Sequence, residues 1–169
     1  MKSLTLLLLR HAEAEAALPG REDMDRALSP RGRTEARDAA DCIAGAELHI
    51  DTMLVSPALR TRETATIVAE QLDFATALQI EPTLYLGEPE ALLLPVQRCG
   101  PDAQTVMVVG HNPGLHELAL SYAGRDEGVE KARLAGGFPT AAAAVFIEDA
   151  DGGWSLERVL SPRAIRGPR

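Results

Sequence analysis

Three apolar runs along the chain each end in polar or charged residues. They are SLTLLLL at 3–9, DTMLVS at 51–56 and TVMVVG at 105–110. The apolar residues within each run follow one another without polar alternation. This pattern predicts central strands that are covered on both faces, as in a largely parallel sheet between helices.

Between and after these runs, apolar residues recur at helical spacing. Residues three or four positions apart share one apolar face in 32–46, in 58–72 and from Pro113 onward. Another helix is predicted over 88–97. Pro30 and Pro113 stand where a first helical turn would begin, a position that tolerates proline because its N–H would lack a helical partner anyway.

The last third of the chain has a different pattern. Residues 125–140 are polar and contain glycine, so they predict a loop with at most a short helix. The segments 141–149 and 154–162 predict two strands joined by the turn residues DADGG. The alternation of strand and helix therefore predicts one α/β domain over 1–169, with a mostly parallel sheet and an antiparallel C-terminal hairpin.

Composition limits both the core and the function. The chain has 169 residues, of which 46% are hydrophobic and only 4% aromatic, so aliphatic side chains must build the core. The net charge of −8, without a dense basic stripe, argues against nucleic-acid binding. An acidic chain that handles phosphate must instead build a local basic pocket.

Two further features bear on the cellular compartment of the protein. Cys42 and Cys99 form no CxxC pattern, so we expect small buried thiols in a reducing compartment rather than a disulfide framework or a thiolate zinc site. The first apolar run is short for a signal peptide and is interrupted by Arg10 and His11. No run approaches the roughly 20 apolar residues of a membrane span. These features predict a cytoplasmic protein that does not bind membranes.

The residues that follow the three predicted strands carry the candidate chemistry. Arg10 and His11 follow the first run, Arg60 lies shortly after the second, and His111 follows the third. Ligands of open α/β sheets bind outside the carboxyl ends of the strands, where helix N-termini also favour anions. Two guanidiniums at one site need an anion, and arginine matches phosphate bidentately. With two imidazoles beside them, the predicted occupant is a phosphoryl group.

These segments resemble the motifs of a known family, in the same order along the chain. The segments LLRHAEA, VSPALRTRETA and VVGHNPGL are similar to motifs of the histidine phosphatase superfamily, and DRALSPRGRTEA and the closing VLSPRAIR are similar to its small SixA-type phosphohistidine phosphatases. Ala12 stands where the superfamily usually has glycine, and the SixA-type branch commonly has alanine there. The resemblance implies a three-layer α/β/α sandwich of the phosphoglycerate mutase-like type.

The resemblance also implies roles for individual residues of these motifs. It implies a phosphatase that needs no metal or cofactor and forms a phosphohistidine on His11. The attacking nitrogen must be unprotonated, so we expect the other ring nitrogen to be held by an acceptor such as a backbone carbonyl, and neighbouring arginines to favour the neutral ring. Arg10 and Arg60 are expected to clamp the phosphoryl oxygens. His111 is expected across the phosphate from His11, protonated by the field of the anion.

Arg26 matches an arginine of the SixA-type pattern D..R.L. It is expected either to line the entrance of the site or to pair with a carboxylate such as Asp23 or Asp25. The remaining candidates are interpreted as structural or solvent-exposed: Arg62, His49, His116 and Asn112. If the segment after Pro57 is helical, Arg60 and Arg62 point in different directions.

The substrate implied by the SixA-type resemblance is a phosphohistidine-bearing protein, such as a phosphotransfer domain or a phosphocarrier. A phosphatase for small phosphate esters on the same fold stays open, with Glu88 or Glu90 as a general acid. A phosphate-binding module without turnover is a further alternative, although binding alone would need only the arginines. A metallohydrolase using His11 and His111 ranks last, because no HxH pair or carboxylate cluster has metal-ligand spacing.

Overall fold

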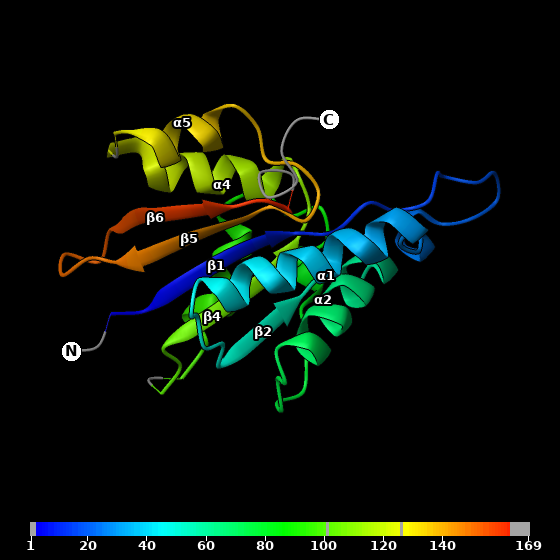
Figure 1. Cartoon of the computed structure of the whole chain (residues 1–169), viewed down its shortest axis with the longest axis horizontal. Coiled ribbons are helices and arrows are strands. Elements are labelled where there is room, and N and C mark those ends of the chain that lie inside the picture. The colour runs from blue at the N-terminus through cyan, green and yellow to red at the C-terminus, as the bar shows by residue number, and fades with distance from the viewer. Residues whose placement is uncertain (1–2, 101, 126, 163–169) are drawn as a thin grey trace.

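A six-stranded sheet forms the centre of the computed structural model, which describes residues 3–100, 102–125 and 127–162 (Figure 1). The strands lie in the order β3-β2-β4-β1-β5-β6. Their bounds are β1 Thr5–Arg10, β2 Thr52–Val55, β3 Gln79–Ile80, β4 Thr105–Gly110, β5 Ala143–Glu148 and β6 Trp154–Leu160. The first four strands of that order are parallel to one another, and β5 and β6 are antiparallel to their neighbours. The predicted mostly parallel sheet and antiparallel C-terminal hairpin are confirmed.

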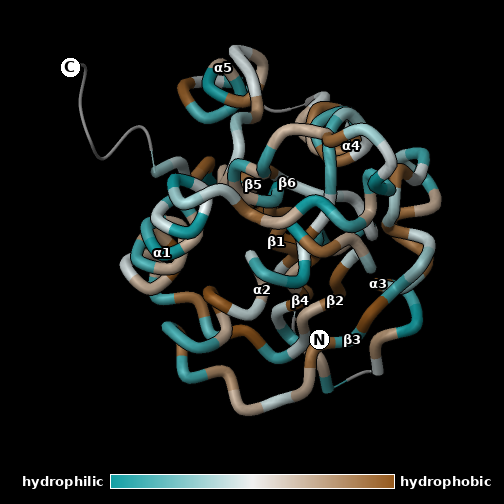
Figure 2. The backbone as a smooth tube through the Cα atoms, turned by 90° about the vertical axis from the view of Figure 1, so that its right-hand side faces the viewer, coloured by the Kyte–Doolittle hydropathy of each residue, from teal (hydrophilic) through white to brown (hydrophobic). Residues whose placement is uncertain are grey.

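Helices cover both faces of this sheet. Helices α1 (Pro30–Gly45) and α2 (Leu59–Gln71) lie on one face, and α4 (Gly114–Tyr122) and α5 (Val129–Ala135) lie on the other (Figures 1 and 2). In β1, Leu7 and Leu9 pack in the core with α1 and α2, whereas Leu6 and Leu8 pack in the core with α4. The strand is therefore buried on both sides, which explains its continuous apolar run. The predicted three-layer α/β/α sandwich is confirmed.

Local sequence explains where α1 begins. Ser29 caps the helix through its Oγ, which accepts a hydrogen bond from the N–H of Gly32 at 3.0 Å, and Pro30 occupies the first helical turn. The helix thus begins two residues before the predicted 32–46. A Cβ at Gly32 would overlap the carbonyl oxygen of Glu13, so glycine permits α1 to pack against the segment that follows β1.

One prediction about secondary structure is wrong, and one strand was not predicted. The helix predicted over 88–97 is only a short 3₁₀ turn, Ala91–Leu93, followed by α3 (Leu94–Gln97). An α-helix through the whole segment would place Pro95 in its interior, where proline removes a hydrogen bond and clashes with the preceding turn. The edge strand β3 was not predicted, because its two residues are exposed and form no apolar run.

Other expectations fall partly within the described residues. Cys42 and Cys99 are free thiols, and both are half-buried rather than fully buried. Only the first part of the closing segment VLSPRAIR lies within the described residues, because the description ends at Pro162. No helix in the described part of the chain has the length and the apolar character that crossing a bilayer requires.

Candidate active site

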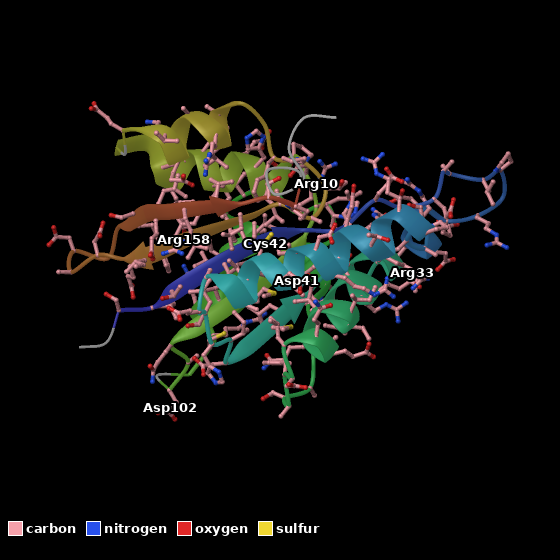
Figure 3. All side chains as sticks on the ribbon, in the orientation of Figure 1. Arg10, Arg33, Asp41, Cys42, Asp102 and Arg158 are labelled. Atoms are coloured by element: carbon pink, nitrogen blue, oxygen red, sulfur yellow. The ribbon has the colours of Figure 1, made fainter. Side chains whose placement is uncertain are left out.

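The register of the parallel strands brings the predicted site residues to one edge of the sheet. Arg10 pairs with Gly110, so the residues that follow them, His11 and His111, leave the sheet side by side. The N–H of His11 donates to the carbonyl of Gly110 at 3.0 Å, and the two imidazole centroids are 5.2 Å apart in an edge-on arrangement. Figure 3 shows Arg10 at this end of β1, far from Asp102 at the opposite end of the sheet.

His11 is held with one ring nitrogen free of a proton. Its Nδ1 lies 2.7 Å from the carbonyl oxygen of Ala12, and a carbonyl can only accept, so Nδ1 carries the hydrogen and Nε2 the lone pair. Burial, together with the positive charges of Arg60 and Arg10, lowers the pKa of His11 to about 4 against the opposing effect of the Ala12 carbonyl. The expected backbone acceptor is present, and the lowered pKa favours the expected neutral ring.

His111 is held in the opposite tautomer. Its Nδ1 lies 3.3 Å from Nη2 of Arg60, which can only donate, and its Nε2 lies 2.7 Å from Oγ of Ser56. Nδ1 is therefore an acceptor, and Nε2–H donates to Ser56. Burial, together with the charges of His11 and Arg60, lowers the pKa of His111 to about 3. In the field of the protein alone His111 is neutral; its protonation by a bound anion remains a prediction.

The geometry of helix α2 places Arg60, and not Arg62, at the site. The Arg60 side chain is only 4% exposed, whereas Arg62 lies on the exposed face of the helix. Thr64, one turn further along α2, connects this helix to the segment after β1: its Oγ1 donates to the carbonyl of Arg60 at 2.7 Å and accepts the N–H of Ala12 at 3.1 Å. The predicted helical separation of the two arginines is confirmed.

Arg60 and Arg26 meet on one carboxylate, that of Asp23. Arg60 Nη2 donates to Oδ2 at 2.9 Å, Arg60 Nη1 donates to the Asp23 backbone carbonyl at 2.7 Å, and Arg26 Nη1 donates to Oδ1 at 3.0 Å. The hydroxyl of Tyr85 also donates to Oδ2, at 2.9 Å. We call these four residues, Asp23, Arg26, Arg60 and Tyr85, the Asp23 cluster.

Two consequences follow for the Asp23 cluster. The hydrogen bond from Arg26, followed by those from Tyr85 and Arg60, holds the pKa of Asp23 far below its usual range, so the carboxylate stays ionised. Of the two pairings proposed for Arg26 from the sequence, the one with Asp23 is formed. Arg26 therefore joins the site through a carboxylate that also binds Arg60.

Arg10 approaches the same edge from the other side. Its Nη1 donates to the carbonyl of Phe138 at 2.9 Å, and Nδ2 of Asn112 donates to the same oxygen at 2.9 Å. A cavity of about 610 Å³ adjoins these residues and includes Pro139 in its lining. Asn112 thus anchors the turn after β4, as expected, and the site has an open space with mixed polar and apolar walls beside one of its arginines.

The remaining candidates lie outside this constellation. Glu88 and Glu90, the candidate acids, are both exposed. His49 is 94% exposed, and His116 has its Nε2 2.7 Å from the carbonyl of Leu134. Within 3–100, 102–125 and 127–162, no group of three or more His, Cys, Asp or Glu side chains is placed to hold a metal ion.

Sequence reasoning did not identify Ser56 or Tyr85 as site residues. Ser56 directly follows β2 as His11 and His111 follow β1 and β4, so its position at a strand end could have indicated it. Tyr85 has no comparable signal. Its ring contacts His111 edge-on at 5.5 Å only because the chain folds back after β3.

Chemically, the site combines a nucleophile with an anion clamp. The lone pair on Nε2 of His11 can attack an electrophile, and the nearby guanidiniums can stabilise negative charge on that electrophile. Within the described part of the chain, Nε of Arg60 is buried and has no hydrogen-bond acceptor. A buried donor of this kind is costly unless a partner satisfies it, and an oxyanion would be such a partner.

Comparisons with known proteins identify several relatives. A family model described as the histidine phosphatase superfamily (branch 1) matches residues 6–85. A crystal structure from Agrobacterium tumefaciens, assigned to phosphohistidine phosphatase SixA, is 32% identical and has a TM-score of 0.82, with 96% of this chain and 99% of that chain covered. An uncharacterized protein of Mycobacterium tuberculosis is 35% identical over 141 residues, 82% of this chain and 85% of that protein. Phosphohistidine phosphatase SixA of Escherichia coli is 29% identical over 114 residues, 65% of this chain and 68% of that protein.

Proposed function

The chain belongs to the histidine phosphatase superfamily and is of SixA type, and from this premise we propose that it hydrolyses protein phosphohistidine through a covalent intermediate on His11. The observation that carries this proposal is the tautomer of His11. Nδ1 is bound to the carbonyl of Ala12 at 2.7 Å, so Nε2 keeps its lone pair in a ring whose centroid lies 5.2 Å from that of His111, the partner of Arg60. A residue that only bound phosphate would need a donor there, not a lone pair.

In the first step, Nε2 of His11 attacks phosphorus and the bond from phosphorus to the leaving group breaks. Arg10 and Arg60 donate hydrogen bonds to the phosphoryl oxygens and offset the negative charge that the transition state spreads over them. The dianion raises the proton affinity of His111, which then acts as another donor. In the second step, water attacks the phosphohistidine, releasing inorganic phosphate and restoring neutral His11.

The leaving group favours phosphohistidine over an alkyl phosphate ester. An alkyl ester must expel an alkoxide, a departure that needs a placed proton donor. The candidate donors Glu88 and Glu90 are both exposed. The carboxylate of Asp23 stays ionised and therefore has no proton to donate. The imidazole of phosphohistidine can itself be protonated before it leaves, because its pKa as a free group is about 6.5.

A side-by-side assay tests this function. Turnover is measured on a phosphohistidine protein, an aryl phosphate and an alkyl phosphate, each with and without a chelator. We expect fastest turnover on phosphohistidine and no effect of the chelator. Equal rates on alkyl phosphate would favour the small-ester phosphatase, no turnover on any substrate would favour a binding module, and loss of activity with the chelator would favour a metallohydrolase.

A further inference from the structure

The carboxylate of Asp23 receives donors from three separate parts of the chain. Arg60 comes from α2, Arg26 follows the 3₁₀ helix Asp23–Asp25, and Tyr85 follows the 3₁₀ turn Pro82–Leu84. The side chain of Asp23 is nevertheless 44% exposed. Water can solvate a half-exposed carboxylate, so Asp23 does not need three donors for its own solvation. The three donors are better explained if Asp23 fixes their positions.

The geometry around Arg60 shows what is fixed. Both terminal nitrogens of its guanidinium donate to Asp23, one to the carboxylate at 2.9 Å and one to the backbone carbonyl at 2.7 Å. Two parallel hydrogen bonds of this kind set the plane of the group as well as its position. With its plane so fixed, Arg60 still keeps Nη2 3.3 Å from Nδ1 of His111. Asp23 therefore holds the guanidinium of Arg60 beside His111 and does not draw it away.

We propose that Asp23 is a positioning residue that orients Arg60 and Arg26 toward the phosphoryl group, and that Tyr85 holds Asp23 in place. This inference rests on the proposed function, since it concerns the same anion clamp. The opposite role would be that of a place-holder, in which the carboxylate occupies the position of the phosphoryl group and must be displaced by it. The two roles predict opposite changes in oxyanion affinity when Asp23 is neutralised.

Charge supports the positioning role. Arg10, Arg26 and Arg60 are always protonated, and Asp23 stays ionised because its three donors keep its pKa far below the usual range. The four groups together carry a net charge of two positive units, which matches a phosphoryl dianion. Without the carboxylate, Arg26 and Arg60 would repel each other and separate.

The test compares Asp23→Asn with Asp25→Asn, a control that removes one negative charge from the same 3₁₀ helix at an exposed residue. Tungstate binding is measured by calorimetry, and kcat/KM is measured on a phosphohistidine protein. For Asp23→Asn we expect both tungstate affinity and kcat/KM to fall by about 10-fold to 100-fold, the effect of losing one charged hydrogen bond. The melting temperature should stay close to that of Asp25→Asn.

Tyr85→Phe provides a second variant, because it removes only the hydroxyl donor to Asp23 and should lower tungstate affinity in the same direction by a smaller factor. Tighter tungstate binding by Asp23→Asn would establish the place-holder role and overturn the proposal. Equal behaviour of Asp23→Asn and Asp25→Asn would also overturn it, while leaving the proposed function intact. A wild-type chain that neither binds tungstate nor hydrolyses phosphohistidine would instead reject the proposed function itself.

Discussion

Oγ of Ser56 lies 2.7 Å from Nε2 of His111, although the two residues are 55 positions apart in the chain. They meet because β2 and β4 are adjacent and parallel, with Val55 paired to Val109, so both strands end at the same level. A guanidinium can only donate, so Arg60 makes Nδ1 of His111 an acceptor and leaves the hydrogen on Nε2. The hydroxyl of Ser56 accepts that hydrogen.

Replacing Ser56 by alanine should remove this acceptor. Nε2–H of His111 would be left buried without a partner, which costs about 1–3 kcal/mol of unfolding free energy. We expect kcat/KM to fall by about tenfold, the equivalent of about 1.4 kcal/mol. Urea unfolding and steady-state kinetics measure the two effects, and Ser155→Ala, at a half-buried serine of the hairpin whose hydroxyl donates to Asp149, is the control away from the site. An unchanged kcat/KM would show that catalysis does not need the hydrogen bond between Ser56 and His111.

His11→Ala should abolish turnover while the fold survives, because His11 is only half-buried at the end of a strand. Rapid quench of the wild type with labelled substrate should trap an acid-labile, base-stable phosphoryl group on His11. His49→Ala serves as the control, since His49 is almost fully exposed and far from the site in sequence. The mechanism is rejected if the label never reaches His11 or if His11→Ala still turns over.

Arg60→Ala should lose about 2–4 kcal/mol of transition-state stabilisation, as removal of an oxyanion donor does in other enzymes. Arg62→Ala, two residues away on the exposed face of α2, should have little effect on kcat/KM. Steady-state kinetics on one aryl phosphate compare the two variants directly. The opposite ranking would show that Arg62, and not Arg60, contacts the phosphoryl group.

We expect both site histidines to stay neutral at pH values well below the pKa of an ordinary histidine. Burial lowers the pKa of His11 to about 4 and that of His111 to about 3, against 6.5 for an unperturbed histidine. Between pH 6.5 and 4 the unfolded chain thus binds more protons than the folded one, so the free energy of unfolding falls as pH is lowered through this window. NMR titration should show no protonation of either ring above pH 5. Urea unfolding should show a smaller loss between pH 7 and 5 for His11→Ala than for the wild type.

Titration of His11 or His111 near pH 6.5 would contradict this prediction. It would mean that the rings are more hydrated in solution than their burial indicates.

The sequence predicts a site residue when a strand or helix pattern fixes its position, and it does not when the residue lies in an irregular segment. The positions of Arg10, His11 and His111 follow from strand ends alone, since continuous apolar runs mark parallel strands and their carboxyl ends meet at one edge. The choice of Arg60 over Arg62 follows from helical geometry once α2 is assumed. In contrast, the contact between Asp23 and Tyr85 joins two irregular segments, 62 positions apart, whose paths no periodic pattern describes. The 3₁₀ turn in place of a longer helix before Pro95 could have been anticipated from the proline itself.

The last prediction concerns the leaving group, and it distinguishes a phosphohistidine phosphatase from a small-ester phosphatase. An alkoxide is a poor leaving group because its conjugate acid is about as weak as water, with a pKa of about 15–16. We therefore expect high activity on phosphohistidine, measurable activity on aryl phosphates and poor activity on phosphoserine or other alkyl phosphates.

Glu88→Gln and Glu90→Gln test whether either glutamate protonates the leaving group. Both glutamates are exposed, so neither substitution should change the rate on phosphohistidine by more than about twofold. If one of them were a general acid, its loss would slow alkyl esters far more than activated aryl esters, because only the alkoxide depends on the donated proton. Comparable wild-type rates on alkyl phosphate and phosphohistidine, together with such a selective loss in either variant, would replace the phosphohistidine assignment by that of a small-ester phosphatase.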